Sequence, residues 1–368
     1  MANKIIFGGT FDPIHNGHLR IALEASLKLN ADVIFVPSKS PRWKTPLTAV
    51  EHRLKMLKIA MRNAPAGSQI SDYELKSPDP INYSIDTVRF FKKKYPKDTL
   101  YFLIGADQVN RFAEWKDAEE LSQLAKVTFV SRPKYELDKL VVETYKMLDL
   151  SYMDSGDVSS TDFREMKTLD IPSEVLRYIE KNRLYYIGKI ASFINEKRLD
   201  HSIQVANLAL SIAKFNRLPN PEKYYFTGLL HDLGKTPNMS GDEVDAFMKK
   251  HFPEYVNLPR FSYHQFIGAY LAEHEFGIKD KEILDAIACH CTGKDNMSTL
   301  AMVVYAADKI EPTRQFDSRW LINSCLKDWK QGFLDTLTDN KKYLLAHNKD
   351  ISNELTDRCF KMYLEGKN

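Results

Sequence analysis

The most informative stretch in the first half of the chain runs from Gly8 to Leu19 and reads GGTFDPIHNGHL. It follows a strand-like run and opens an amphipathic segment, which predicts a strand, a turn and a helix. Gly8 and Gly9 let the backbone approach a ligand closely. His15 and His18 lie at the predicted helix N-terminus, which offers free N–H groups and a positive dipole end. Because both imidazoles can also donate hydrogen bonds, the pattern predicts a phosphate-binding turn.

A second polar cluster lies far downstream, where the chain reads SSTDFR from Ser159 to Arg164. Hydroxyl groups ahead of a helix cap it and can bind anions. Arg164 adds a planar donor pair suited to phosphate. Taken alone, a capped helix with an exposed arginine explains this cluster equally well.

The second half carries histidines and aspartates at wide intervals on predicted helices. They are His201, His231, Asp232, His264, His290 and Asp308. A single histidine on a helix is more often a solvated or satisfied side chain than a metal ligand. The adjacent pair His231-Asp232 differs because it lies inside an apolar run, where burying two ionisable groups is costly unless they are paired or bind metal. Nitrogen and oxygen ligands of this kind favour iron or manganese.

Composition limits the class of protein. The chain has 368 residues, of which 43% are hydrophobic and 27% charged, with a net charge of +3. This balance disfavours a basic nucleic-acid binder, and no apolar run approaches the ~18 residues of a membrane span. The N-terminal residues lead directly into a predicted strand, so we expect no signal peptide. The four cysteines match neither a zinc pattern nor a disulfide framework, so we expect a cytoplasmic protein with reduced thiols.

The first half alternates strand-like and helical stretches, which predicts a mainly parallel α/β sheet with ligands at the carboxyl ends of its strands. The expected strands are Lys4–Gly8, Asp32–Pro37, Thr99–Gly105 and Lys126–Ser131. The expected helices are Gly17–Leu29, Thr48–Arg62 and Ser84–Lys94, the last capped by Ser84.

The second half shows only helical periodicity, which predicts an all-α domain. The expected helices are Ile190–Arg198, His201–Phe215, Tyr224–Asp232, Tyr263–Phe276, Glu282–His290 and Leu300–Lys309. We place the junction near Tyr186–Lys189, which gives domains over residues 1–187 and 188–368.

The two N-terminal clusters resemble the nucleotidyltransferases that carry a T/HxGH motif and a downstream SSTxxR motif, a family with a Rossmann-like fold. More narrowly, residues 1–187 resemble nicotinate mononucleotide adenylyltransferases. The matching segments are Pro41–Lys44, Arg53 with Met56, Asn82–Thr87, Ile104–Asp107, Trp115-Lys116, Val130–Pro133 and Ile171–Tyr185. Trp43, Val158 and Phe163 depart from the residues usual in that family.

This resemblance implies adenylyl transfer from ATP to nicotinate mononucleotide, giving deamido-NAD and pyrophosphate, with Mg²⁺ bridging the phosphates. It assigns catalytic phosphate contacts to His15, His18, Lys44 and Arg164. The implied ATP-binding residues are Gly8, Gly9, Thr10, Phe11, Asp12, Gly105, Asp107, Ser159, Ser160 and Thr161. The implied acceptor-binding residues are Tyr83, Ser84, Thr87, Trp115 and Arg132.

In the second half, His201, His231, Asp232 and Asp308 match the metal set of the HD-domain phosphohydrolases, and His264 and His290 leave room for a second ion. The segments His264–Ala269, His290–Gly293 and Ala307–Arg314 are similar to those of HD-domain symmetrical diadenosine tetraphosphatases. That resemblance implies hydrolysis of a dinucleoside polyphosphate to two ADP, with one or two iron or manganese ions. It adds Arg198, Thr292 and Arg314 as nucleotide contacts.

Several alternatives remain open. The HD half could act on another phosphoester, such as a guanosine alarmone, or serve as a regulatory nucleotide-binding module. The N-terminal half could adenylylate another phosphorylated acceptor, such as phosphopantetheine. We expect no nucleic acid or membrane partner, and an oligomer is compatible with the sequence.

Overall fold

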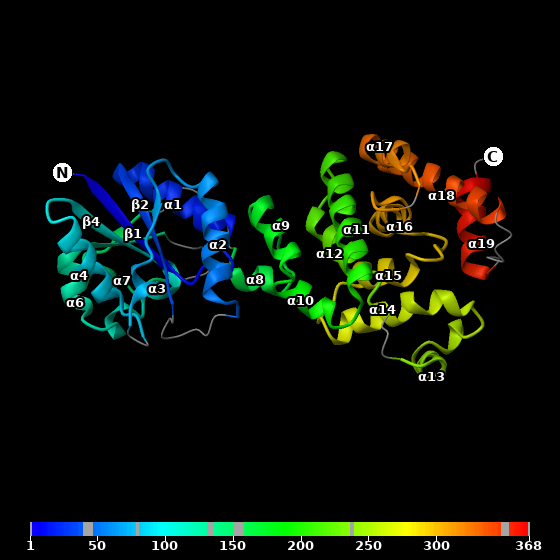
Figure 1. The fold of residues 1–368 in the computed structure, drawn as a ribbon, viewed down its shortest axis with the longest axis horizontal. Coiled ribbons are helices and arrows are strands. Elements are labelled where there is room, and N and C mark those ends of the chain that lie inside the picture. Colours follow the sequence, from blue (N-terminus) through cyan, green and yellow to red (C-terminus); the bar gives the residue numbers. More distant parts are fainter. Residues whose placement is uncertain are drawn as a thin grey trace. The chain divides into compact units, whose positions relative to one another are not determined.

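The computed structural model describes residues 2–39, 47–78, 81–130, 136–150, 158–235, 239–314, 316–346 and 353–366. The chain divides into two compact units, Met1–Tyr186 and Ile187–Asn368 (Figure 1). Each unit has its own architecture, and each is described by itself.

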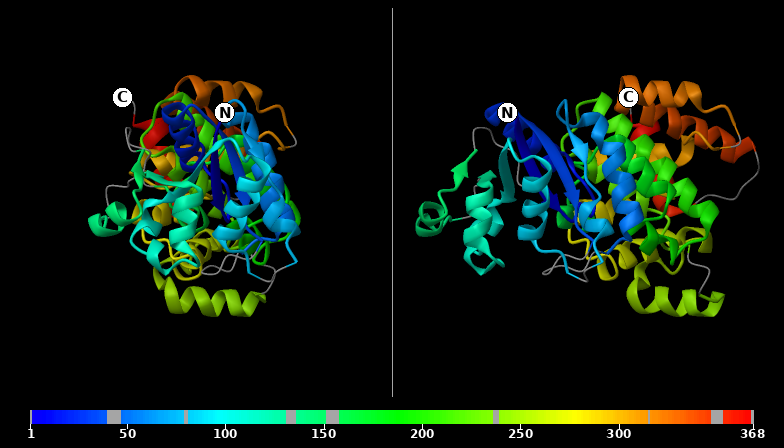
Figure 2. Two further views of the ribbon diagram at one scale, coloured as in Figure 1. Left: turned by 90° about the vertical axis from the view of Figure 1, so that its left-hand side faces the viewer. Right: turned by 60° about the vertical axis from the view of Figure 1, so that its left-hand side comes forward.

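The N-terminal unit is built on a six-stranded sheet in the order β3-β2-β1-β4-β5-β6. Its strands are β1 (Asn3–Gly9), β2 (Ala31–Pro37), β3 (Gln69–Ile70), β4 (Thr99–Gly105), β5 (Lys126–Val130) and β6 (Leu148–Asp149). All neighbouring pairs are parallel, and the run of β1 beside β2 is visible in blue in Figure 2. Because β1 pairs with both β2 and β4, the strand order reverses there, and ligands bind at the carboxyl ends flanking such a point.

The N-terminal unit also contains helices, several of which pack directly on the strands. They are α1 (Asn16–Leu29), α2 (Val50–Ala60), α3 (Tyr73–Lys76), α4 (Ser84–Lys94), α5 (Ala106–Val109), α6 (Ala118–Leu124), α7 (Lys139–Thr144), α8 (Ser160–Arg164) and α9 (Ser173–Lys181). Strand side chains alternate between the two faces. Ile6 and Phe102 therefore join Ile85 of α4 in one apolar cluster, whereas Phe7 meets the rings of Phe35 and His18.

The predicted α/β fold is confirmed, but several details differ, and the helices α3, α5, α6 and α7 were not predicted. Ser84 is the first residue of α4 rather than its cap, because Tyr83 takes the N-cap position and makes no side-chain cap hydrogen bond. The strands β3 and β6 were not predicted, since two residues are too few for a periodic signal.

The C-terminal unit is helical, and its described residues contain no strand. Its helices begin with α10 (Tyr186–Ala191), which spans the division, and continue with α11 (Glu196–Phe215), α12 (Pro221–Leu230), α13 (Gly241–His251), α14 (Tyr263–His274), α15 (Lys281–Cys289), α16 (Thr299–Ile310), α17 (Arg319–Lys327), α18 (Trp329–Ala346) and α19 (Glu354–Phe360). The all-α prediction is confirmed. Within the described ranges, no helix is both long and apolar enough to span a membrane.

The predicted helix Ile190–Arg198 is wrong. The chain leaves the helix after Ala191 and starts α11 at Glu196. Asn195 causes the new start, because its side chain accepts a hydrogen bond from the main-chain N–H of Arg198 and so caps α11. Helices α13, α17, α18 and α19 were also not predicted.

Candidate active sites

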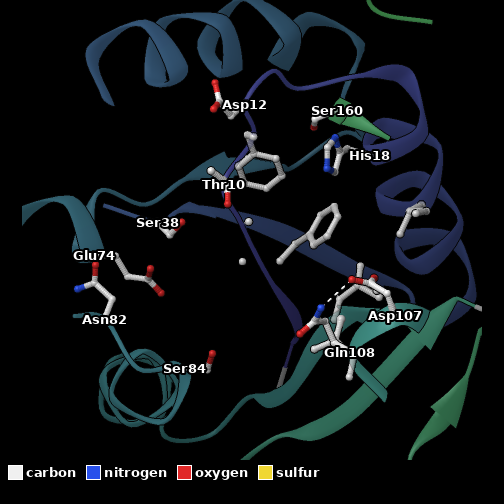
Figure 3. Close-up of a pocket in the computed structure, with 18 of the residues that line it drawn as sticks. Thr10, Asp12, His18, Ser38, Glu74, Asn82, Ser84, Asp107, Gln108 and Ser160 are labelled. Carbon is white, nitrogen blue, oxygen red and sulfur yellow. Dashed lines mark hydrogen bonds between the residues drawn. The ribbon is translucent and has the colours of Figure 1, made fainter. Parts of the chain in front are cut away.

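A cavity of about 740 Å³ opens beside the ends of β1 and β4 in the N-terminal unit (Figure 3). It gathers most of the residues predicted for adenylyl transfer, although they lie far apart in the sequence. The predicted residues in its wall are Gly8, Gly9, Thr10, Phe11, Asp12, His15, His18, Tyr83, Ser84, Thr87, Gly105, Asp107, Trp115, Ser159, Ser160, Thr161 and Arg164. Lys44 and Arg132 lie outside the described residues.

His15 and His18 cap α1 reciprocally. The main-chain N–H of His18 donates to His15 Nδ1, and the main-chain N–H of His15 donates to His18 Nδ1, both at 3.3 Å. An Nδ1 that accepts a hydrogen bond carries no proton, so the proton of each neutral ring is on Nε2. The two rings stack with centroids 3.6 Å apart. The start of α1 therefore supplies two imidazole N–H donors at a wall of the cavity.

The downstream cluster docks on the turn that follows β1. Ser160 Oγ donates to the carbonyl oxygen of Pro13 at 2.9 Å, and Arg164 Nη1 donates to that of Asp12 at 2.6 Å. A second nitrogen of Arg164 donates to Thr161 Oγ1 at 2.9 Å. Ser159 caps α8 through the main-chain N–H of Asp162. The fold thus joins the two predicted phosphate-binding clusters.

Arg53 holds the turns around the cavity and is only 1% exposed. Its guanidinium donates to the carbonyl oxygens of Thr10 and Ser38 at 2.7 and 2.8 Å, and to those of Thr48 and Lys39 at 3.2 and 3.4 Å. Burial lowers its pKa. Because Thr10 follows β1 and Ser38 follows β2, one side chain ties together the two chain segments that leave these strands.

The wall of the cavity also includes Trp115 and Thr87, and polar residues that the sequence did not single out, such as Glu74 and Gln108. Figure 3 shows Glu74 and Gln108 on different sides of the cavity. Trp115 is half-buried, as expected, and packs on the ring of Phe112 with centroids 5.3 Å apart. Gln108 donates to Asp107 at 2.6 Å. Glu74 lies in a four-residue helix, which is too short to give a sequence signal for a buried carboxyl group.

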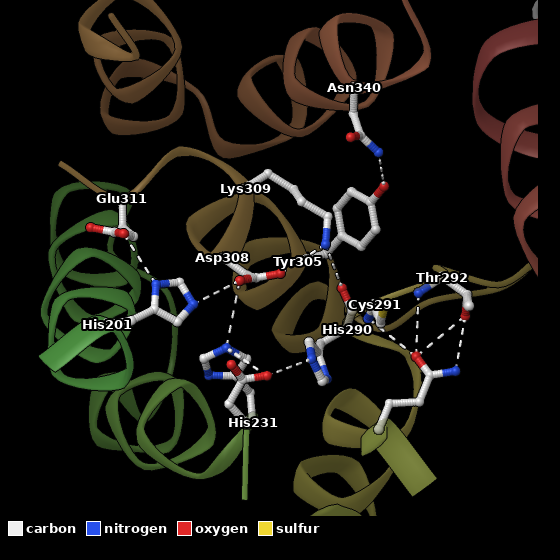
Figure 4. Close-up of polar contacts among 12 residues, drawn as sticks. His201, His231, His290, Cys291, Thr292, Tyr305, Asp308, Lys309, Glu311 and Asn340 are labelled. Carbon is white, nitrogen blue, oxygen red and sulfur yellow. Dashed lines mark hydrogen bonds and ion pairs between the residues drawn. The ribbon is translucent and has the colours of Figure 1, made fainter. Parts of the chain in front are cut away.

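In the C-terminal unit, the six predicted metal ligands form one buried cluster. Figure 4 labels four of them, His201, His231, His290 and Asp308. They come from α11, α14 and α16 and from the ends of α12 and α15. Three overlapping sets have ligand atoms within 4.8 Å of one another: His201 with His231 and Asp232, His231 with His290 and Asp308, and Asp232 with His264 and His290. Asp232 Oδ1 lies 3.6, 3.5 and 3.4 Å from the Nε2 atoms of His231, His264 and His290.

Main-chain carbonyls orient three of these histidines. The Nδ1 atoms of His231, His264 and His290 lie 2.7, 2.7 and 2.8 Å from the carbonyl oxygens of Gly228, Phe261 and Ile287. A carbonyl oxygen only accepts, so each Nδ1 carries the proton. Each neutral ring then presents the lone pair of its Nε2 to the centre of the cluster, as a metal ligand must.

The cluster fits a bound cation. Burial lowers the pKa of both His264 and His290, which keeps the rings neutral. Their Nε2 atoms nevertheless face each other at 3.1 Å, an arrangement of two lone pairs that a positive ion between them would stabilise. His231 Nε2 is buried with no hydrogen-bond partner among the described residues. The donor set of imidazoles and carboxylates suits a divalent transition metal.

His201 is oriented differently, between two carboxylates. Its Nδ1 lies 3.1 Å from Glu311 Oε1, and its Nε2 lies 3.0 Å from Asp308 Oδ1. Although burial opposes a charged ring, these carboxylates raise the pKa of His201. Glu311 lies in the segment Ala307–Arg314 named above but was given no role, because its contact with His201 depends on the packing of α16 against α11.

A glycine allows the His-Asp turn to lie against α14. A Cβ built on Gly234 would come within 1.9 Å of the carbonyl oxygen of His264 and 2.6 Å of the main-chain nitrogen of Gly268. Any larger residue would push His264 away from Asp232. The close approach therefore positions ligands from two separate elements.

The three residues predicted to contact the nucleotide differ in whether they contact the metal-ligand cluster. Arg198 Nη1 lies 3.4 Å from Asp232 Oδ2, and Arg314 Nη2 lies 2.7 Å from Asp308 Oδ1, and both arginines are partly exposed. Thr292 is 3% exposed and hydrogen bonds with Gln265 and Gly293 instead. The fold thus brings both arginines, but not Thr292, into direct contact with the cluster.

The fold and the two sites define a nucleotidyltransferase unit joined to a metal-binding HD domain. Two family models match accordingly: "Cytidylyltransferase-like" over residues 6–166 and "HD domain" over residues 198–313. A probable nicotinate-nucleotide adenylyltransferase/Ap4A hydrolase from Mycoplasma genitalium is 33% identical, and the match covers 90% of this chain and 96% of that protein. The chain therefore belongs to the family of fused nicotinate-nucleotide adenylyltransferase/Ap4A hydrolases.

Two further relatives match about half of the chain. The nicotinate-nucleotide adenylyltransferase of Bacillus subtilis is 38% identical, covering 49% of this chain and 96% of that protein. The crystal structure of a predicted HD superfamily hydrolase involved in NAD metabolism from Clostridium acetobutylicum is 28% identical. It covers 48% of this chain and 96% of that one, with a TM-score of 0.43.

Proposed function

We propose that the chain is a bifunctional enzyme. Residues 1–187 transfer an adenylyl group from ATP to nicotinate mononucleotide, giving deamido-NAD and pyrophosphate. Residues 188–368 hydrolyse diadenosine tetraphosphate to two ADP in a metal-dependent reaction. The proposal rests on the family to which the chain belongs and on one observation in each unit, and the expected cytoplasmic location stays a prediction.

For adenylyl transfer, the supporting observation is the pair of Nε2–H donors that His15 and His18 present at the start of α1. The phosphate oxygen of the acceptor attacks the α-phosphorus of ATP, a new P–O bond forms, and the bond to pyrophosphate breaks. Such a transfer needs positioning and charge stabilisation rather than a covalent intermediate. We assign the ATP phosphates to His15, His18, Lys44 and Arg164, and Mg²⁺ bound with ATP would supply further neutralisation of the phosphate charge.

The other cavity residues are assigned to the two substrates. The ATP side comprises Gly8, Gly9, Thr10, Phe11, Asp12, Gly105, Asp107, Ser159, Ser160 and Thr161. The acceptor side comprises Tyr83, Ser84, Thr87 and Trp115, with the ring of Trp115 stacked on the pyridine ring. Arg132, which lies outside the described residues, is assigned to the acceptor as well.

Acceptor choice tests this assignment. A site built for a carboxylate leaves polar groups unpaired when it meets an amide, at about 1–3 kcal/mol per group. We expect nicotinate mononucleotide to have a higher kcat/KM than nicotinamide mononucleotide at neutral pH. Equal values, or a preference for phosphopantetheine, would contradict the acceptor assignment.

For hydrolysis, the supporting observation is the inward-facing set of Nε2 lone pairs around Asp232. His201, His231, Asp232, His264, His290 and Asp308 would hold one or two iron or manganese ions. A bound divalent metal supplies Lewis acidity and lowers the pKa of water. Arg198 and Arg314 lie where they can bind the phosphates, with Thr292 further away. Adding water across the central phosphoanhydride bond gives two ADP.

The decisive experiment incubates the purified chain with Mg²⁺, Fe²⁺, Mn²⁺ or Co²⁺ and a panel of nucleotides, and identifies every product by chromatography. We expect deamido-NAD from ATP and nicotinate mononucleotide, and ADP alone from diadenosine tetraphosphate. ATP plus AMP as first products would contradict the symmetrical cleavage. Hydrolysis of a guanosine alarmone instead, or no hydrolysis with any metal, would favour one of the alternatives stated above.

A further inference from the structure

A buried carboxyl group in the wall of the N-terminal cavity has no role in the function proposed above. Glu74 comes from α3 and is 8% exposed. Its Oε1 accepts a hydrogen bond of 2.7 Å from Thr87 Oγ1, in the first turn of α4. Figure 3 shows Glu74 beside Asn82 at the same end of the cavity.

The start of α4 suits an anionic group. Tyr83 at its N-cap makes no side-chain cap hydrogen bond, and the positive dipole end of this 11-residue helix is offset only in part by the carboxylate of Asp86 in its first turn. Asn82 and Trp115 line the same cavity, and the donor Trp115 Nε1 has no hydrogen-bond partner in the part of the chain that the structure describes. An aromatic acceptor carrying a carboxylate fits these groups, with its ring on Trp115 and its carboxylate at α4.

A carboxylate at this position would lie against Glu74, and two carboxylates in contact cannot both stay ionised. Burial raises the pKa of Glu74 to about 7, although the hydrogen bond from Thr87 lowers it. The uncharged form of Glu74 is therefore available near neutral pH.

Other charged groups do not determine whether Glu74 is protonated. Charged side chains on α3, on α4 and beside Trp115 have their own partners: Asp72 with Lys76 at 2.7 Å, Asp86 with Arg89 at 3.2 Å, and Lys116 over the ring of Tyr83 at 4.4 Å. The charged or titratable residues elsewhere in the cavity wall are Asp12, His15, His18, Asp107 and Arg164. Burial and Thr87 alone account for the pKa of Glu74, so a ligand carboxylate would be its main electrostatic neighbour.

We propose that Glu74 determines the acceptor specificity of the adenylyltransferase site, because an acceptor carboxylate at the start of α4 binds only while Glu74 is uncharged. The inference rests on the proposed function. Above about pH 7, binding of nicotinate mononucleotide takes up one proton from solvent. Nicotinamide mononucleotide needs no such proton, since its amide N–H₂ donates to the ionised carboxylate.

The sign of the pH effect follows. Below about pH 7, Glu74 is already uncharged in the free enzyme, so its titration does not affect acceptor binding. Above that pH, the ionised form must first be protonated, which weakens binding of the carboxylate acceptor by up to about tenfold per pH unit.

The test measures kcat/KM for both mononucleotides from about pH 6.5 to about pH 9 and takes their ratio, in which titration of the shared phosphate group cancels. In the unaltered enzyme the preference for nicotinate should fall by up to about tenfold per pH unit above neutrality. In Glu74→Gln, which keeps an acceptor for Thr87, the ratio should be independent of pH. The matched control Asp72→Asn neutralises an exposed carboxylate on the same segment and should behave like the unaltered enzyme.

A second measurement needs no variant. Calorimetric titration of the unaltered enzyme with each mononucleotide, in two buffers of different ionisation enthalpy, should show about one more proton taken up with nicotinate than with nicotinamide at about pH 8. Equal uptake, or an unchanged pH slope in folded Glu74→Gln, overturns the role of Glu74 and leaves adenylyl transfer standing. No transfer to either mononucleotide at any pH overturns the proposed function itself.

Discussion

In the N-terminal unit, the polar groups that face the cavity come from turns after strands and from helix starts, whereas those of the C-terminal cluster come from helices and are almost fully buried. The first site uses separate donors, from two histidines, Arg164 and the main chain, around a cavity. The second concentrates imidazoles and carboxylates that lie within 4.8 Å of one another in overlapping sets. Both arrangements suit phosphate chemistry, but only the second needs a cation to offset its own buried groups.

This difference has a testable consequence, which is that the two activities depend on separate residues and respond differently to loss of metal. Removing one side chain from the N-terminal cavity removes one hydrogen bond to substrate. In the C-terminal cluster, Asp232 contacts several other metal ligands, so its removal disturbs the whole cluster. The predictions below follow this contrast, from the largest expected effect to the smallest.

Asp232→Ala should abolish hydrolysis, with a loss of at least ~10³ in rate, because Asp232 Oδ1 lies between three imidazoles. Metal content, measured by elemental analysis, should fall with it. Adenylyl transfer by the same preparation should stay the same. The control Asp245→Ala removes an exposed partner of Arg260 and should leave both activities intact.

His18→Ala should reduce adenylyl transfer by ~10²–10³, the usual effect of removing one preorganised donor from a developing charge. Hydrolysis and metal content should not change. His52→Ala is the matched control, since His52 contacts Tyr178 rather than the cavity. If folded His18→Ala or folded Asp232→Ala lost both activities, the description as two independent sites would be wrong.

Glu311→Gln should weaken metal binding about 10–100-fold without removing a ligand, as expected when the partner of a coordinating histidine loses its charge. Glu311 is 2% exposed, and its Oε1 lies 3.1 Å from His201 Nδ1. Titration of the metal-free chain with Mn²⁺ measures the affinity. Asp317→Asn, which alters only an exposed pair with Arg319, is the control, and an equal affinity in both variants would contradict the role of Glu311.

The comparison also shows what a sequence can predict. The phosphate-binding turn was predictable because Gly8–Leu19 is contiguous and its order implies strand, turn and helix. The residues of the C-terminal cluster were predictable, since burying an adjacent His-Asp pair in an apolar run costs free energy unless the two side chains are paired or bind a metal. In both cases the residue types carried the information, and the fold confirmed that the residues lie together.

Contacts set by tertiary packing were not predictable. Glu311 meets His201 only because α16 packs against α11, and Glu74 is buried by elements distant in the sequence. Local errors have local causes. Asn195 caps a new helix at a point where periodicity predicted that the preceding helix continues to Arg198, and Tyr83 rather than Ser84 is the N-cap of α4. Apolar periodicity reports which faces are buried but not which polar side chain will cap or pair.

The smallest predicted effect concerns the support of the phosphate-binding turn by Tyr185. Its hydroxyl donates to Asp12 Oδ1 at 2.8 Å, while the main-chain N–H of Leu47 donates to Asp12 Oδ2 at 2.8 Å. Burial raises the pKa of Tyr185, so the hydroxyl remains a donor across the working pH range. Asp12 in turn accepts from Arg164 through its carbonyl oxygen, which links Tyr185 to a proposed ATP contact.

Tyr185→Phe should therefore lower the free energy of unfolding by about 1–3 kcal/mol, because Asp12 is 4% exposed and loses one of its donors. It should also raise the KM for ATP several-fold, with kcat less affected, since the turn shifts while its donors remain. Tyr178→Phe removes a comparable hydroxyl that contacts His52 at 2.9 Å, away from the cavity wall. Chemical denaturation and steady-state kinetics are measured on both variants. If Tyr185 only stabilised the fold, Tyr185→Phe and Tyr178→Phe would have the same KM for ATP. A higher KM for ATP in Tyr185→Phe alone indicates that Tyr185 supports the turn.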